Sequence, residues 1–186
     1  GFVGSQPGSS VTLYLRLTID AVKNSTIRSS IIRLTSHESV ESVGSFVDCR
    51  ISILDPSEYT NSTNLTNEDI RNFSTLSETV DKSFPLWTLG QSDTNTSIDV
   101  TSLVQSFVEQ ESYTAGKRAI FKIETLPTTP TGSYRAFRGF STTTSRNPRI
   151  TTSYTINTAE VTSDTAFQSS KSYHFQFEFA DEEETR

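Results

Sequence analysis

The chain of 186 residues is long enough for one domain, and 22 acidic against 16 basic side chains give it a net charge of −6. This acidic balance disfavours nucleic acid as a partner, and the absence of a long apolar run predicts no membrane insertion. Ser and Thr make up 57 residues and Met is absent, which argues against a helical bundle and favours strands joined by polar turns. The single cysteine excludes an internal disulfide.

The first third of the chain predicts an arm and three strands. Residues 1–11 are rich in Gly and Ser, which predicts a flexible N-terminal arm, and the Gly start without any Met indicates a processed or excerpted chain. Apolar and polar residues alternate over 13–20, 26–35 and 46–54, the pattern of half-buried strands. Cys49 falls on the apolar side of the third strand, so we expect a buried, unreactive thiol.

The middle of the chain is polar and then turns apolar. Residues 55–83 predict a long loop, in which Asn67 could cap a single helical turn. The apolar stretch 84–89 is expected to return to the sheet. A short strand over 97–100 then leads into a helix over about 101–110, capped by Thr101, with one apolar stripe that closes an end of the β core.

The last third predicts further strands and a separate C-terminal extension. Alternation predicts strands over 118–125, 134–140 and 149–156, followed by a polar linker over about 157–170. In the final predicted strand, aromatic residues alternate with polar ones before an acidic tail, and these aromatics are Tyr173, Phe175, Phe177 and Phe179. They bury their face either on the chain's own sheet or on a neighbouring subunit, and the sequence leaves both open.

These elements predict an all-β fold, an antiparallel jelly-roll-like β-sandwich with one short helix. Strands without a regular βαβ rhythm are typical of such sandwiches. The predicted organisation is a flexible arm over 1–11, a sandwich domain over 12–156, and a linker, extra strand and acidic tail over 157–186.

Several short segments carry a resemblance to a known family. They are Leu-Arg-Leu at 15–17, Ile-Arg-Leu at 32–34, Cys-Arg-Ile at 49–51, Trp87, the strand-to-helix junction at 97–105, the strand at 135–140 and Asn-Pro-Arg-Ile at 147–150. In this order they resemble the jelly-roll domains of the DNRLRE type, which occur beside carbohydrate-active modules in secreted bacterial proteins and in virion proteins of tailed phages. The resemblance implies a binding or linking module without a catalytic apparatus. The long polar segment 55–83 and the strand beyond 156 depart from the family pattern.

No pattern in the sequence points to catalysis or to a cofactor. The candidate carboxylates Asp48, Asp99 and Glu124 fall on separate strands, and Asp99 is better explained as a backbone acceptor near the start of the helix. His37 and His174 are far apart in polar surroundings. Asp93 and Asp99 flank a turn that could hold Ca²⁺, but without a spaced acidic loop we predict no metal site.

Exposed aromatic side chains are the remaining candidates for ligand binding, because sugars stack on aromatic faces. The candidates are Tyr59, Tyr113, Tyr134 and Trp87, with Phe140 as a further one. We expect Tyr59 and Tyr113, which lie in polar loops, to be exposed, whereas a core position is favoured for Trp87.

The sequence predicts a non-enzymatic structural or assembly protein, a capsid decoration or tail component of a phage-like virion. Its expected partners are neighbouring subunits, contacted through the C-terminal aromatics. The alternative is a carbohydrate-binding or adhesion module of a secreted protein, with surface glycans as partners; both place the chain on a virion or outside the cell. A glycosylated eukaryotic surface protein ranks third, with Asn-x-Ser/Thr triplets at Asn24, Asn61, Asn64, Asn72 and Asn95.

Overall fold

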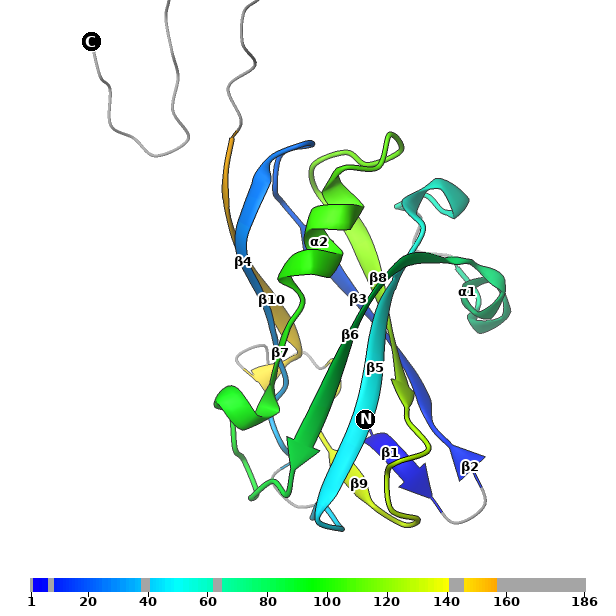
Figure 1. Cartoon of the computed structure of the whole chain (residues 1–186), viewed down its shortest axis with the longest axis vertical. Helices are drawn as coiled ribbons and strands as arrows, with labels where there is room; N and C mark the ends of the chain where they lie inside the picture. The colour runs from blue at the N-terminus through cyan, green and yellow to red at the C-terminus, as the bar shows by residue number, and fades with distance from the viewer. Residues whose placement is uncertain (1, 7–8, 38–40, 62–64, 141–145, 157–186) are drawn as a thin grey trace, which may run out of the picture.

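Two antiparallel sheets pack face to face in this protein (Figure 1). The computed structural model describes residues 2–6, 9–37, 41–61, 65–140 and 146–156. The larger sheet has the strand order β3-β8-β5-β6, with β3 at Thr12–Ile19, β8 at Lys117–Thr125, β5 at Phe46–Leu54 and β6 at Thr75–Pro85. The facing sheet has the order β10-β4-β7, with β10 at Arg149–Thr155, β4 at Thr26–Arg33 and β7 at Ser97–Asp99.

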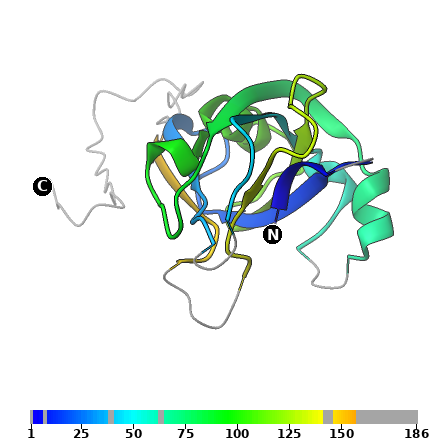
Figure 2. The same ribbon diagram turned by 90° about the horizontal axis from the view of Figure 1, so that it is seen from below.

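A third, small sheet lies at one end of the sandwich. Its order is β2-β1-β9, with β2 at Ser9–Ser10, β1 at Phe2–Gln6 and β9 at Tyr134–Ala136. Four short helical segments complete the described chain: η1 at Pro56–Glu58, α1 at Asn67–Asn72, η2 at Thr94–Thr96 and α2 at Thr101–Val108. The views in Figures 1 and 2 place α1 and β10 on opposite sides of the molecule. Within the described residues, no helix has both the length and the apolar character needed to cross a bilayer.

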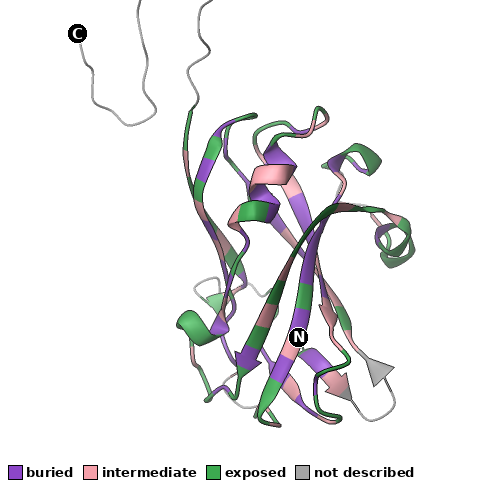
Figure 3. Ribbon diagram, viewed as in Figure 1, coloured by how far each residue is buried: buried purple, intermediate pink, exposed green. Residues whose placement is uncertain are grey.

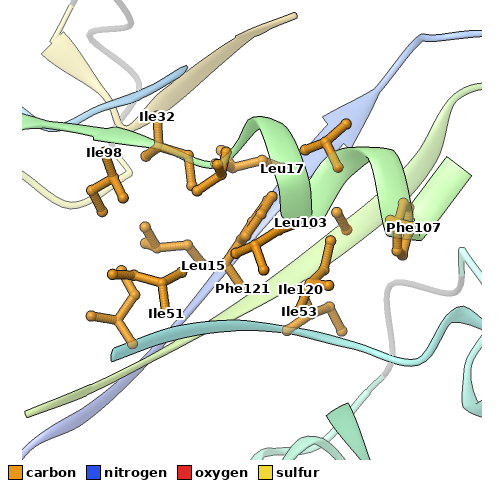
Figure 4. Close-up of a cluster of buried hydrophobic side chains, with 14 of the residues drawn as sticks. Leu15, Leu17, Ile32, Ile51, Ile53, Ile98, Leu103, Phe107, Ile120 and Phe121 are labelled. Carbon is orange, nitrogen blue, oxygen red and sulfur yellow. The ribbon is translucent and has the colours of Figure 1, made fainter. Parts of the chain in front are cut away.

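The hydrophobic core fills the space between the sheets and extends under α2. Along β5 the burial alternates from Phe46 to Ile51 as the sequence pattern predicts, and Ser52, Ile53 and Leu54 are then all buried (Figure 3). Figure 4 shows side chains from both sheets and from α2 meeting in one cluster, among them Leu15, Ile32, Ile51, Leu103 and Phe121. The prediction of an all-β antiparallel sandwich is therefore confirmed, and so is the helix that closes an end of the core.

The start of α2 differs in detail from the prediction. Its N-cap is Val100, which makes no side-chain capping bond. The hydroxyl of Thr101 instead accepts a hydrogen bond from the backbone N–H of Ser30 on β4, at 2.9 Å. The carboxylate of Asp99 accepts from the backbone N–H and the hydroxyl of Thr101, at 3.0 and 2.6 Å, as expected for a backbone acceptor. The prediction of Thr101 as the cap is wrong, because that hydroxyl joins α2 to the sheet.

The prediction of a flexible arm is wrong for residues 2–6. Strand β1 pairs with β9, and the side chain of Val3 is fully buried in the core. Gly4 fits here because its φ is +137° and a Cβ would come within 2.4 Å of the carbonyl oxygen of Ser133. Gly4, part of the composition that suggests a linker, therefore allows close strand pairing instead.

The predicted long loop over 55–83 contains a helix and most of a strand. Strand β6 pairs with β5 from Phe46 opposite Pro85 to Leu54 opposite Thr75. It is a mostly exposed edge strand, and Lys82 occupies an inward position across from Cys49, so its sequence lacks clear alternation. The helix α1 is capped by Thr66 and not by Asn67, through a reciprocal pair of hydrogen bonds with Asp69. The fold thus has a second short α-helix besides the predicted one.

Candidate functional site

Three of the four predicted ligand-binding aromatics are buried and cannot offer a ring face to a sugar. The exposed fractions are 5% for Tyr59, 4% for Trp87 and 1% for Tyr113. The expectation of exposed loop tyrosines is therefore wrong for Tyr59 and Tyr113, whereas the core position of Trp87 is confirmed. Each of the three rings packs instead on a phenylalanine: Tyr59 on Phe73, Trp87 on Phe84 and Tyr113 on Phe107.

The contacts of these rings explain their burial. Trp87 packs edge-to-face on Phe84, with ring centroids 5.2 Å apart, and its indole N–H donates to the carbonyl of Asn95 at 3.2 Å. Tyr59 stacks on Phe73, which follows α1, and the ammonium of Lys117 lies 5.3 Å from its ring centroid. Burial raises the pKa of Tyr59 above its ordinary value. These are packing contacts of the sandwich.

Among the four main candidates, Tyr134 is the one that remains partly exposed. Its ring meets Phe2 edge-to-face at 5.7 Å, and Val43 pairs with it across an isolated β-bridge. Phe2 and Val43 are 40% and 45% exposed, so these three residues form an apolar patch on the small sheet. Phe140, beyond β9, is also largely exposed. We call Phe2, Val43 and Tyr134 the apolar patch.

A polar groove runs along the outer face of the β10-β4-β7 sheet. Its volume is about 400 Å³, and its lining alternates between β4 and β10: Ser29, Ile31, Arg33, Arg149, Thr151 and Ser153. The pairing register sets Arg149 opposite Arg33, Thr151 opposite Ile31 and Ser153 opposite Ser29. Two arginines therefore lie opposite each other at one end, and the rest of the lining is three hydroxyl side chains and Ile31. We call this the arginine groove.

The two arginines of the groove have no acidic partner among the described residues. The ion pairs found in that part of the chain join Arg50 to Asp81 and Lys122 to Glu124, both at 2.8 Å on the other sheet. Asp99 lies beside Ile31 on β7, but its carboxylate is bound to Thr101. Like charges directly opposite each other on neighbouring strands repel, so an anion placed here would relieve that repulsion.

The candidate carboxylates do not converge on a site. Asp48 lies on β5 and accepts a hydrogen bond from the hydroxyl of Thr128 at 2.8 Å. Glu124 lies on β8 and pairs with Lys122, while Asp99 belongs to the opposite sheet. Each carboxylate therefore serves a local structural contact, and the geometry supports no pair for acid–base chemistry.

Asp93 and Asp99, the residues considered as metal ligands, also make hydrogen bonds that stabilise the local structure. The carboxylate of Asp93 accepts hydrogen bonds from the side chain of Gln91 and the backbone of Asn95, and these bonds lower its pKa. Asp93 is the cap of η2, so its oxygens are already engaged. In the part of the chain that the structure describes, no three His, Cys, Asp or Glu side chains gather as metal ligands would.

Cys49 is fully buried on the inner face of β5, as predicted. Burial, together with the negative charge of Asp48, raises the pKa of its thiol to about 12. The thiolate is therefore scarce near neutral pH. His37 is half-buried, whereas His174 and the four C-terminal aromatics, Tyr173, Phe175, Phe177 and Phe179, lie outside the described residues.

The sequence does not single out three arginines whose positions stand out in the structure: Arg33, Arg149 and Arg135. Arg33 and Arg149 become neighbours only through the pairing of strands far apart in the chain. Arg135, predicted simply as part of a strand, is fully buried on β9 and donates to five backbone carbonyls. One arginine in a short apolar strand does not by itself predict a buried arginine, because most arginines in strands point into solvent.

Comparisons with family models, with curated proteins and with solved structures found no match to this chain. The features of this chain that point to a function are therefore the apolar patch, the arginine groove and the sequence that follows β10.

Proposed function

We propose that this chain is a non-enzymatic structural protein that joins neighbouring subunits, as a capsid decoration or tail component of a phage-like virion. The observation that carries the proposal is that residues 2–156, as far as the structure describes them, already form two packed sheets around one core. Side chains such as Ile19, Ile32, Ile51 and Phe121 are fully buried and pack with one another in a single core cluster of described residues. The row of four aromatics over 173–179 is then available for burial elsewhere.

An open sheet edge offers a place for such burial. Among the described strands, β10 pairs with β4 only, so its other edge presents unpaired backbone groups. Ile150 and Tyr154 on its inner side pack against the core but are only half-buried. A strand added to this edge would complete their burial and extend the sheet, which is the usual form of β-strand addition between molecules. The resemblance to DNRLRE-type domains, some of which occur in virions, supports the same function.

Exchanging two C-terminal aromatics for serine is expected to abolish self-association. In the full chain, F175S/F177S removes two large apolar side chains, each worth about 1.5–3 kcal/mol when buried, so the dissociation constant should rise about a hundredfold or more. Light scattering coupled to size-exclusion chromatography, over a range of concentrations, measures this. The matched control is L86S/F140S, which changes two exposed side chains on the described domain.

Two results would contradict the proposal. One is a wild-type chain that stays monomeric at every concentration; the other is an F175S/F177S variant that associates as strongly as the wild type. Circular dichroism of each variant checks that the sandwich is intact. The virion assignment is tested separately, by mass spectrometry of purified particles from the source, which should contain the chain in many copies.

The alternative, a carbohydrate-binding or adhesion module, is favoured by the apolar patch. Tyr134 keeps part of its ring exposed beside Phe2, and aromatic faces of this kind stack on sugar rings. If this function holds, the chain should be retained on an immobilised polysaccharide, and Tyr134→Ala should abolish that retention. Leu89→Ala, an exposed apolar control, should leave it unchanged. Absence of retention on a broad polysaccharide panel would exclude this alternative.

A further inference from the structure

We propose that the arginine groove binds the acidic run 181–184 of a second copy of this chain. The inference rests on the proposed function, because it names the surface that receives the C-terminal segment. The ligand is four consecutive carboxylates, Asp-Glu-Glu-Glu, which begin two residues after the last aromatic residue, Phe179. The receiving groups are the guanidinium groups of Arg33 and Arg149.

The groove matches this ligand in charge. Arg33 and Arg149 are exposed, are direct cross-strand neighbours, and have no ion-pair partner among the described residues. Guanidinium groups bind carboxylates through two parallel hydrogen bonds, which makes an arginine pair a suitable site for adjacent acidic side chains. The hydroxyls of Thr151 and Ser153 extend the groove with further hydrogen-bonding groups.

The groove and the open edge of β10 together fix the direction of the added strand. The inner side of β10 carries Ile150, Thr152 and Tyr154; Thr152 hydrogen-bonds to the buried Ser30, and the other two pack on the core. In the added strand, the aromatic row must lie on the same side of the sheet as these three residues. The acidic run then lies at the C-terminal end of the added strand. Because Arg149 is the first residue of β10, the acidic run reaches it only if the added strand is antiparallel to β10.

A register follows from this direction. With Phe179 opposite Ile150, the aromatics fall on the inner side, and Glu178 falls opposite Thr151 on the outer side. Glu178 is then a diagonal neighbour of Arg149, a distance that long side chains can span. The acidic run begins two residues after Phe179 and therefore lies at the arginine end of the groove.

The length of the linker favours a second copy over the chain's own tail. Adjacent antiparallel strands in one chain are usually joined by about two to five residues, whereas 14 residues, 157–170, separate β10's end region from the aromatic segment. Fully extended, 14 residues span about 45 Å, enough to reach a neighbouring molecule of this size.

A charge exchange in the full chain tests the proposal. The groove variant is R33E/R149E, the tail variant is E182K/E183K/E184K, and a third protein combines both sets. Sedimentation equilibrium at low salt gives the dissociation constant of the dimer. We expect the dissociation constant to rise about tenfold in the groove variant and in the tail variant, because several exposed ion pairs are lost and replaced by repulsion. In the combined protein, the dissociation constant should return toward the wild-type value.

A matched control distinguishes an effect of the groove arginines from an effect of the net charge of the protein. R28E/R71E makes the same change in net charge at two exposed arginines outside the groove, and it should leave the dissociation constant within about twofold of the wild type. Raising the salt concentration should weaken the wild-type dimer and leave the groove variant less affected.

The outcomes distinguish this inference from the proposed function. If F175S/F177S abolishes association while R33E/R149E has no effect, the groove assignment is wrong and the assembly function stands. If the wild-type chain does not associate at all, both the assembly function and the groove assignment are wrong. If the combined protein recovers only an intramolecular contact, seen as protection of the tail from proteolysis without dependence on concentration, the occupant is the chain's own tail and the second-copy proposal is overturned.

Discussion

Replacing Arg135 by methionine is expected to lower the free energy of unfolding by about 3 kcal/mol or more. The guanidinium is fully buried and donates to the carbonyls of Pro85, Val43 and Tyr134 at 2.5, 2.7 and 2.9 Å. It also donates to the carbonyls of Phe84 and Gly44 at 3.1 and 3.2 Å. Methionine fills a similar volume but donates nothing, so several buried carbonyls lose a partner.

These carbonyls come from three separate segments, which is why the effect should be large. The end of β6, the turn before β5 and strand β9 meet at this one side chain. Burial lowers the pKa of Arg135, since the charged form loses its water, but five acceptors compensate for that loss. Lysine cannot replace it, because a single ammonium lacks the planar fork that reaches all three segments.

Urea titration followed by the fluorescence of the buried Trp87 measures the change in free energy. Arg28→Met, at an exposed position on β4, is the matched control and should change stability by less than about 0.5 kcal/mol. A loss of less than about 1 kcal/mol in Arg135→Met would mean that the five hydrogen bonds do no more than offset the desolvation of the charge.

The sequence predicts the parts of this fold where one side of a strand is buried. Strand β5 has the predicted bounds, and β3, β8 and β10 agree to within a residue or so, because their inner positions are apolar and their outer positions polar. Edge strand β6 is not predicted from the sequence. Most of its residues are exposed and Lys82 occupies an inward position, so apolar and polar residues do not alternate along it. Strand β1 does not show in the sequence pattern, because it contains Gly4, which its close pairing with β9 requires.

The candidate surfaces were less predictable, for a different physical reason. Whether a loop tyrosine is exposed depends on what the loop packs against, and Tyr59 is covered because α1 leads Phe73 onto its ring. The arginine groove depends on the register between β4 and β10, which bring together residues 33 and 149. Local patterns carry no information about pairing between strands so far apart in the chain.

Removing the ring of Tyr113 is expected to cost about 3–5 kcal/mol of stability, although the sequence places this residue among polar neighbours. The ring packs edge-to-face on Phe107 of α2 at 5.3 Å, and its hydroxyl donates to the carbonyls of Ile19 and Ala21 at 3.0 and 2.6 Å. Tyr113 therefore joins the helix to the end of β3. Burial raises the pKa of its hydroxyl, which keeps it protonated as a donor.

Two substitutions distinguish the contribution of the Tyr113 ring to stability from that of its hydroxyl. Tyr113→Phe keeps the packing and leaves two carbonyls without that donor, so the loss should be about 1–2 kcal/mol, whereas Tyr113→Ala should lose the full amount in the same urea titration. Thr114→Ala, at the exposed neighbouring position, should change stability by less than about 0.5 kcal/mol. Because Tyr113 is buried, a Tyr113→Phe protein that stays folded should associate as the wild type does. A weakened dimer in that variant, with stability unchanged, would mean that the hydroxyl of Tyr113 acts at a surface, which would contradict its burial.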